Sequence, residues 1–152
     1  MMQKLLNAAP LIILVFVAMR TTSAFGLEPI YATEGKAIGG YDPVAYFTKE
    51  QAIKGDEDNT HEWEGVVWYF SSNDNLEAFK GSEEQYAPQY GGYCAWAVSQ
   101  NGIADSDPEN WTVYEGKLYL NFSERIHEEW KKDIPGNIVK ADENWPEVLS
   151  TN

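Results

Sequence analysis

The chain has 152 residues, with 24 acidic side chains against 11 basic ones, and a formal net charge of −13 at neutral pH. Such a negative surface repels phosphate backbones and anionic lipid headgroups, which argues against binding to nucleic acids or to membrane surfaces. A single cysteine cannot form a disulfide within the chain, so the core depends on the 6 Trp, 9 Tyr and 6 Phe residues and on aliphatic side chains.

The first 24 residues have the features of an export signal. A lysine gives a positive start, an apolar run follows over residues 11–19, and residues 22–24 are small enough for cleavage. The run is shorter than the about 20 apolar residues that a membrane span needs. We predict a signal peptide over 1–24, one domain over 25–152 without a membrane span, and a periplasmic or secreted location. Arg20, directly after the run, leaves an uncleaved anchor as the alternative.

Residues 25–35 predict an extended arm. An Asp-Pro turn at Asp42 follows, and the apolar residues after it predict a helical turn or a short strand. Farther on, one pattern occurs twice: an aromatic residue, Glu-Gly, and a run of aromatic and branched side chains. Because glycine accepts a positive φ at a turn and such side chains favour strands, we predict two β-hairpins, over 61–70 and 111–120.

Helices are predicted in the segments between and after the hairpins, where serines can cap their first turns and apolar residues recur at helical spacing. The predicted helices run from Ser72 through 79, over 83–87, over 93–100, from Ser123 to 133, and from Pro135 to 144. Together these elements predict an α+β domain: a small antiparallel sheet built from two hairpins and surrounded by short helices.

Six short motifs follow one another along the chain. They are Gly-Tyr-Asp-Pro-Val-Ala-Tyr-Phe (40–47), His-Glu-Trp-Glu-Gly (61–65), Trp-Tyr-Phe-Ser-Ser (68–72), Tyr-Gly-Gly-Tyr-Cys (90–94), Trp-Thr-Val (111–113) and Asp-Ile-Pro-Gly (133–136). The first three, followed by Ala-Phe (78–79) and Tyr-Ala-Pro (86–88), resemble a YHS domain. All six, in this order, resemble the exported and mostly bacterial proteins that contain a YHS domain. The resemblance covers residues 38–145 and implies the same fold.

The resemblance also implies metal binding, which YHS domains are associated with through a cysteine in an Asp-Pro-Val-Cys element and another after the Tyr-Tyr-Phe strand. This chain has Ala45 at the first place and Ser71 and Ser72 at the second, so that paired-thiolate site cannot form. The remaining soft donors are His61 and Cys94.

We therefore predict a small binding protein that holds copper or zinc through Cys94 and His61, because a thiolate and an imidazole suit these ions. A carboxylate, water or His127 would complete the site, and the protein would buffer, deliver or sense the metal ion. A helix beginning at Cys94 would lower the pKa of the thiol. The structural alternatives are a buried Cys94, a His61 that hydrogen-bonds within its hairpin, and a solvated His127.

Two other functions stay open. In the first, Tyr41, Asp42, Tyr93 and Trp96 form an aromatic site for a small molecule or a protein partner, without metal. In the second, Cys94 is the nucleophile of an enzyme with His61 as its base, and the same aromatic side chains receive the substrate. A non-enzymatic binding protein is the leading prediction.

Overall fold

The computed structural model describes residues 26–151. The predicted signal peptide over 1–24, including its cleavage site, lies outside the described residues. Within the described part of the chain, no helix combines the length and the apolar character that crossing a membrane requires.

Strands and helices alternate along the chain, as the sequence predicts. The strands are β1 (Ala32–Thr33), β2 (Lys36–Ala37), β3 (Asp56–Trp63), β4 (Val66–Phe70), β5 (Asp107–Tyr114) and β6 (Lys117–Asn121). The α-helices are α1 (Ala45–Thr48), α2 (Asn73–Lys80), α3 (Glu83–Tyr86), α4 (Ala95–Ser99), α5 (Glu124–Lys131), α6 (Ile134–Asn144) and α7 (Val148–Thr151). Two 3₁₀ turns span Ile38–Gly40 and Gln89–Gly92. The predicted α+β class and both predicted hairpins are confirmed.

The two predicted hairpins belong to different sheets. One sheet has the order β1-β2-β4-β3, and the β5–β6 hairpin forms the other. The outer edge of β4 is taken by β2, which pairs in parallel through Lys36 and Val67, so the first sheet is mixed rather than antiparallel. The outer edge of β6 is taken by a bridge between Leu120 and Cys94. Strands β4 and β6 therefore each pair on their outer edge with a segment that does not belong to the other hairpin.

A Glu-Gly pair closes each of three hairpins. Both residues have positive φ at 34–35 (52° and 77°), at 64–65 (53° and 79°) and at 115–116 (49° and 74°). Two successive positive φ values define the tight turn whose twist suits a two-residue hairpin. The first of these turns joins β1 to β2, inside the segment for which the sequence predicts only an extended arm.

Serine caps begin two of the helices at the predicted residues. The backbone N–H of Asn75 donates to Ser72 Oγ at 3.1 Å, and that of Ile126 donates to Ser123 Oγ at 3.4 Å. Each hydroxyl satisfies an amide that the first turn of a helix leaves without a partner. Helix α4 is shorter than predicted, because Cys94 is its N-cap and the helix starts at Ala95.

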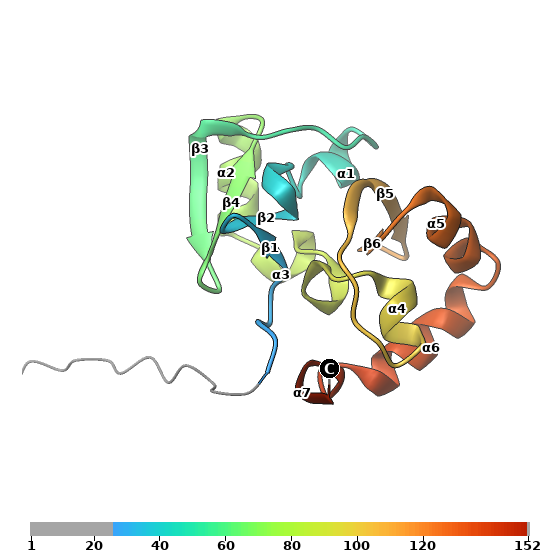
Figure 1. Cartoon of the computed structure of the whole chain (residues 1–152). Coiled ribbons are helices and arrows are strands. Elements are labelled where there is room, and N and C mark those ends of the chain that lie inside the picture. The colour runs from blue at the N-terminus through green and yellow to red at the C-terminus, as the bar shows by residue number, and fades with distance from the viewer. Residues whose placement is uncertain (1–25, 152) are drawn as a thin grey trace, which may run out of the picture.

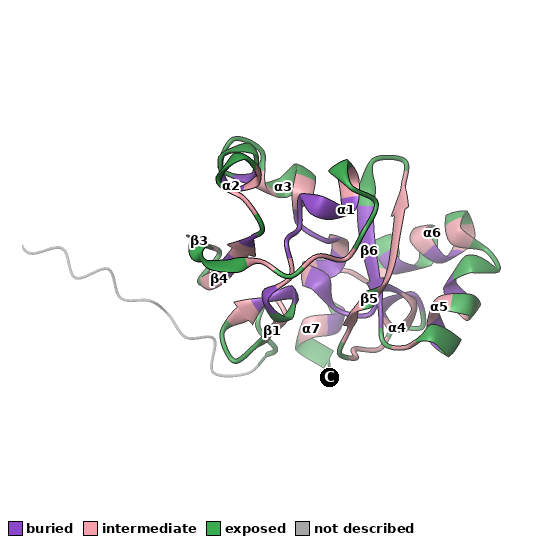
Figure 2. Cartoon of the chain, turned by 90° about the horizontal axis from the view of Figure 1, so that it is seen from above, coloured by how far each residue is buried: buried purple, intermediate pink, exposed green. Residues whose placement is uncertain are grey.

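Strand β6 lies between two hydrophobic cores. Leu118 and Leu120 pack with α1, α2 and β4, whereas Tyr119 packs with α4, α5 and α6. Alternate side chains of a strand point to opposite faces, so β6 supplies both cores. In Figure 2 the buried colour runs along β6, while α2, α5 and α6 expose much of their surface. Figure 1 shows the first sheet with α2 on one side of the molecule and the β5–β6 hairpin with α4–α6 on the other.

Candidate functional site

Cys94 is buried at the junction of α4 and β6, with an exposed fraction of 1%. Its backbone N–H donates to the Ala104 carbonyl at 3.0 Å, and its Sγ lies 3.7 Å from Asn121 Oδ1. That oxygen also accepts the backbone N–H of Trp96 at 3.1 Å. Two donors on one atom fix the orientation of the Asn121 amide, whose Nδ2 is buried without a hydrogen-bond partner.

The chain reaches Cys94 through three consecutive residues with positive φ, as the glycines before it predict. The values are 56° at Tyr90, 61° at Gly91 and 83° at Gly92. The N-terminal arm crosses this loop, where the Tyr31 N–H donates to the Gly91 carbonyl at 2.9 Å. A Cβ at Gly91 would overlap the carbonyl of Pro29, so only glycine permits this close approach.

Burial raises the pKa of the Cys94 thiol. Hydrogen bonds from the backbone amides of Ala97, Phe122 and Trp96 act in the opposite direction, but desolvation outweighs them. The amides at the start of α4 thus act in the predicted direction, but the net pKa of the thiol is raised and not lowered as predicted. A buried, protonated thiol suits the packing role of cysteine better than it suits a nucleophile.

His61 lies in the second half of β3, on the face that packs against α2. Its ring is 6.2 Å from the ring of Phe79, and Trp63, two residues later on the same face, is 5.9 Å from Phe79. Strand β3 and helix α4 lie on opposite sides of the molecule (Figure 1). The structure therefore does not bring His61 and Cys94 into one site.

The residues present do not fit the soft-metal site that the resemblance implies. Cys94 contacts an asparagine amide and backbone groups, and His61 contacts an aromatic ring. Across residues 26–151, no group of three or more His, Cys, Asp or Glu side chains is arranged to hold a metal ion.

His127, the candidate third donor, is partly buried rather than solvated. Its Nε2 lies 2.8 Å from the Thr112 hydroxyl, which ties α5 to β5. Burial lowers the pKa of His127; Lys131 acts in the same direction and Glu128 opposes it. The contact holds a helix against a hairpin.

Asp42 is fully buried and accepts hydrogen bonds on both carboxylate oxygens. Oδ1 accepts the backbone N–H groups of Val44 and Ala45, at 2.8 and 3.2 Å. Oδ2 accepts the Ser71 N–H, the Ser71 hydroxyl and Asn75 Nδ2, at 2.8, 2.7 and 2.8 Å. With both oxygens engaged inside the protein, Asp42 positions α1 against the start of α2.

The predicted aromatic site does not form as one cluster. The Tyr41 hydroxyl donates to Glu109 at 3.1 Å, and Tyr41 packs against the first core. Tyr93 and Trp96 pack in the second core, where the Tyr93 hydroxyl donates to the Glu28 carbonyl at 2.8 Å. Burial raises the pKa of both tyrosines, so both hydroxyls stay protonated near neutral pH.

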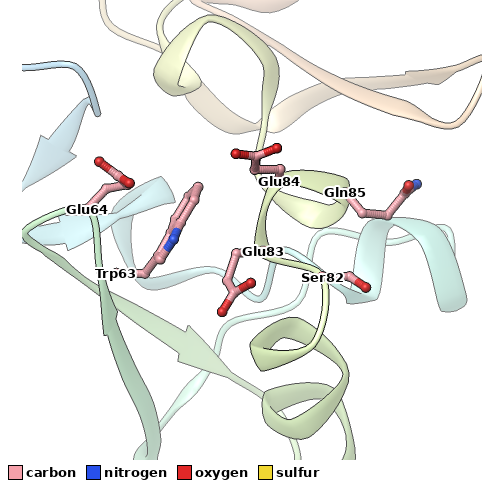
Figure 3. A pocket seen from close by; sticks show the side chains of 6 residues that line it. All are labelled: Trp63, Glu64, Ser82, Glu83, Glu84 and Gln85. Atoms are coloured by element: carbon pink, nitrogen blue, oxygen red, sulfur yellow. The ribbon is translucent and has the colours of Figure 1, made fainter.

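A surface pocket of about 530 Å³ lies elsewhere, between the β3–β4 turn and α3 (Figure 3). It is lined by Trp63, Glu64, Ser82, Glu83, Glu84 and Gln85. Figure 3 shows the indole of Trp63 near the centre, with Glu64 on one side and the α3 residues on the other. None of the site residues predicted from the sequence lines this pocket.

Packing and hydrogen bonds to neighbouring elements fix two of the residues that line the pocket, Trp63 and Gln85. The Trp63 ring packs on Trp68 at 5.6 Å and edge-on to Phe79 at 5.9 Å. The Trp68 Nε1 group donates to the Trp63 carbonyl at 3.1 Å. On the opposite wall, Gln85 Nε2 donates to the Gly116 carbonyl at 3.2 Å, which ties α3 to the β5–β6 turn. The pocket thus joins parts of the chain that are far apart in sequence.

Comparison of the chain with protein-family models, with curated proteins and with solved structures gave no match.

Proposed function

We propose that this chain is a non-enzymatic binding module of the YHS type, exported from the cell, whose ligand site is the Trp63 pocket. The observation that carries the proposal is the pocket itself. Its volume of about 530 Å³ suits a small molecule or one or two side chains of a partner. An indole forms one wall, which is a common anchor for a ligand.

The environment of the only thiol favours binding over catalysis. Cys94 is buried, the pKa of its thiol is raised, and β3, the strand that carries His61, lies apart from α4 (Figure 1). A cysteine nucleophile needs a base within hydrogen-bond reach. Metal binding through Cys94 and His61 stays a prediction from the resemblance, and metal loading tests it separately.

A ligand screen with a blocked pocket tests the proposal. Ligand-observed NMR with a panel of cationic, neutral and anionic small molecules identifies those that bind the purified domain. Glu84→Trp places a large ring at an exposed wall of the pocket without removing a core side chain. Glu143→Trp makes the same change at an exposed helical position outside the pocket.

We expect ligands that bind the wild type and Glu143→Trp but not Glu84→Trp. Ligands that bind all three proteins alike would place the binding site elsewhere, and a panel without a ligand for the wild type would also overturn the proposal. Circular dichroism of the two variants confirms that both are folded.

A further inference from the structure

We propose that the ligand of the Trp63 pocket is an organic cation with two or more primary ammonium groups, of the di- or polyamine class. This inference rests on the proposed function and adds the chemical class of the ligand. It is drawn from the charge, the hydrogen-bonding groups and the spacing of the residues that line the pocket.

The pocket is acidic and lacks a cation of its own. Three of its six lining residues are glutamates, and none is a lysine or an arginine. The ion pairs among the described residues use Glu77, Glu128 and Glu129, so Glu64, Glu83 and Glu84 have no ion-pair partner there. Lys80, close to α3 in sequence, is held by Glu77 at 3.4 Å. A cationic ligand would supply the missing positive charge.

The lining groups mainly accept hydrogen bonds. The Ser82 hydroxyl donates its hydrogen to the Gly81 carbonyl at 2.7 Å, which leaves its oxygen as an acceptor. Gln85 uses one amide hydrogen on the Gly116 carbonyl. Ionised carboxylates only accept. A ligand that complements these groups carries N–H donors, which a primary ammonium has and a quaternary ammonium lacks.

The indole of Trp63 adds a face that attracts cations, since tryptophan has the strongest cation–π interaction among the aromatic side chains. One ring alone is not the aromatic cage that recognises quaternary ammonium ligands. The ring therefore supports an alkylammonium chain that lies across it, with its charged ends on the carboxylates.

The spacing of the carboxylates favours an extended organic ligand over a metal ion. Glu64 follows β3, whereas Glu83 and Glu84 belong to α3 across the pocket (Figure 3). Within the described residues, no three acidic, His or Cys side chains are arranged to hold one metal ion. Charges set apart in this way match a ligand whose ammonium groups are also set apart. The overall charge of −13 would draw such cations toward the surface.

Isothermal titration calorimetry with spermidine tests the inference, at low and at moderate salt because exposed charges are screened. The double variant Glu83→Gln, Glu84→Gln removes two pocket charges and keeps the side-chain shapes. The double variant Glu143→Gln, Glu147→Gln removes the same charge at exposed positions outside the pocket. Tetramethylammonium and Ca²⁺ serve as cations without N–H donors.

We expect saturable binding of spermidine that weakens about tenfold or more in the pocket variant and stays within about twofold in the control variant, since tenfold corresponds to the loss of a charge-assisted contact. Tetramethylammonium and Ca²⁺ should bind at least about tenfold more weakly than spermidine. Equal weakening in both variants, or equal binding of tetramethylammonium, would overturn the inference.

Two further comparisons distinguish a protein partner from a small polyamine, and a wrong ligand class from a wrong site. A trilysine peptide presents the same ammonium groups from a protein, so tighter binding of the peptide than of spermidine would assign the ammonium groups to a protein partner. If the ligands that Glu84→Trp excludes are neutral or anionic, the proposed function stands and the cationic class is wrong. If Glu84→Trp excludes no ligand, both fail.

Discussion

Ser71 donates both its backbone N–H and its hydroxyl to one oxygen of Asp42, at 2.8 and 2.7 Å, although 29 positions separate the two residues. The contact ties the aspartate of the Asp-Pro turn to the residue that directly follows β4. Asp42 lies inside the motif that suggested a binding site, yet its carboxylate is fully committed within the fold.

We therefore expect Asp42→Ala to destabilise the domain by about 3 kcal/mol or more, because it leaves several buried donors without an acceptor. Asp42→Asn should also destabilise it, since an amide nitrogen would then face donors. Urea unfolding followed by circular dichroism measures the change. Asp58→Ala, at an exposed position, is the matched control. A stability loss below about 1 kcal/mol for Asp42→Ala would contradict this role.

The thiol of Cys94 should be protected in the folded protein. We expect it to react with a disulfide reagent such as DTNB roughly 100-fold more slowly in buffer than in urea, because reaction requires local opening. Labelling at the rate of an unhindered thiol in the native state would show that the site is open. Cys94→Ala should cost about 1 kcal/mol of stability through lost packing, and Cys94→Ser less, since its hydroxyl can still donate to Asn121.

Metal loading tests the hypothesis that Cys94 and His61 together bind copper or zinc. After loading with Zn(II) or Cu(I) and dialysis, we expect the metal content per chain to be the same in the wild type, Cys94→Ser and His61→Gln, because the two side chains lie on separate elements. Metal content is measured by atomic emission. Near-stoichiometric metal in the wild type that is lost in Cys94→Ser would instead establish Cys94 as a ligand.

The partial burial of His127 should make stability depend on pH. Folding lowers the pKa of His127 below its usual value of 6.5, so the unfolded chain binds a proton more readily than the folded chain. This contribution is present above pH 6.5, is lost as the pH falls toward the folded pKa, and stays lost below it. Acid therefore destabilises the domain through this residue.

Unfolding by urea at about pH 8 and about pH 5 measures the effect. The loss of stability between these values should be smaller in His127→Gln than in the wild type, while His61→Gln keeps His127 in place and serves as control. Equal losses in His127→Gln and the wild type would exclude His127 as the source.

Local features of the fold could be predicted from the sequence because their causes are local. The Glu-Gly turns at Gly65 and Gly116 need only a residue that accepts positive φ, and Ser72 and Ser123 cap the helices that they precede. The same Glu-Gly pair occurs at Glu34 and Gly35, so the sequence also contains the local signal for the third hairpin.

Features that depend on distant contacts could not be predicted. The burial of Cys94 depends on Asn121 and Leu120, and the partner of each strand edge is not encoded in the hairpin itself. The Trp63 pocket combines a turn with α3, and its signals, an aromatic residue before Glu-Gly and a pair of glutamates after Ser82, are common ones. The candidate site residues came from motifs, and the structure distributes those motifs between two cores.

Strand β6 limits how this chain can be divided. The motifs that resemble a minimal YHS domain end before residue 90, yet Leu118 and Leu120 of β6 complete the core around them. A fragment that stops at Pro88 would lack both leucines and would expose the apolar surface of the first core that they cover. We therefore expect that residues 38–88 do not fold on their own. The two hydrophobic cores should unfold together in one cooperative transition.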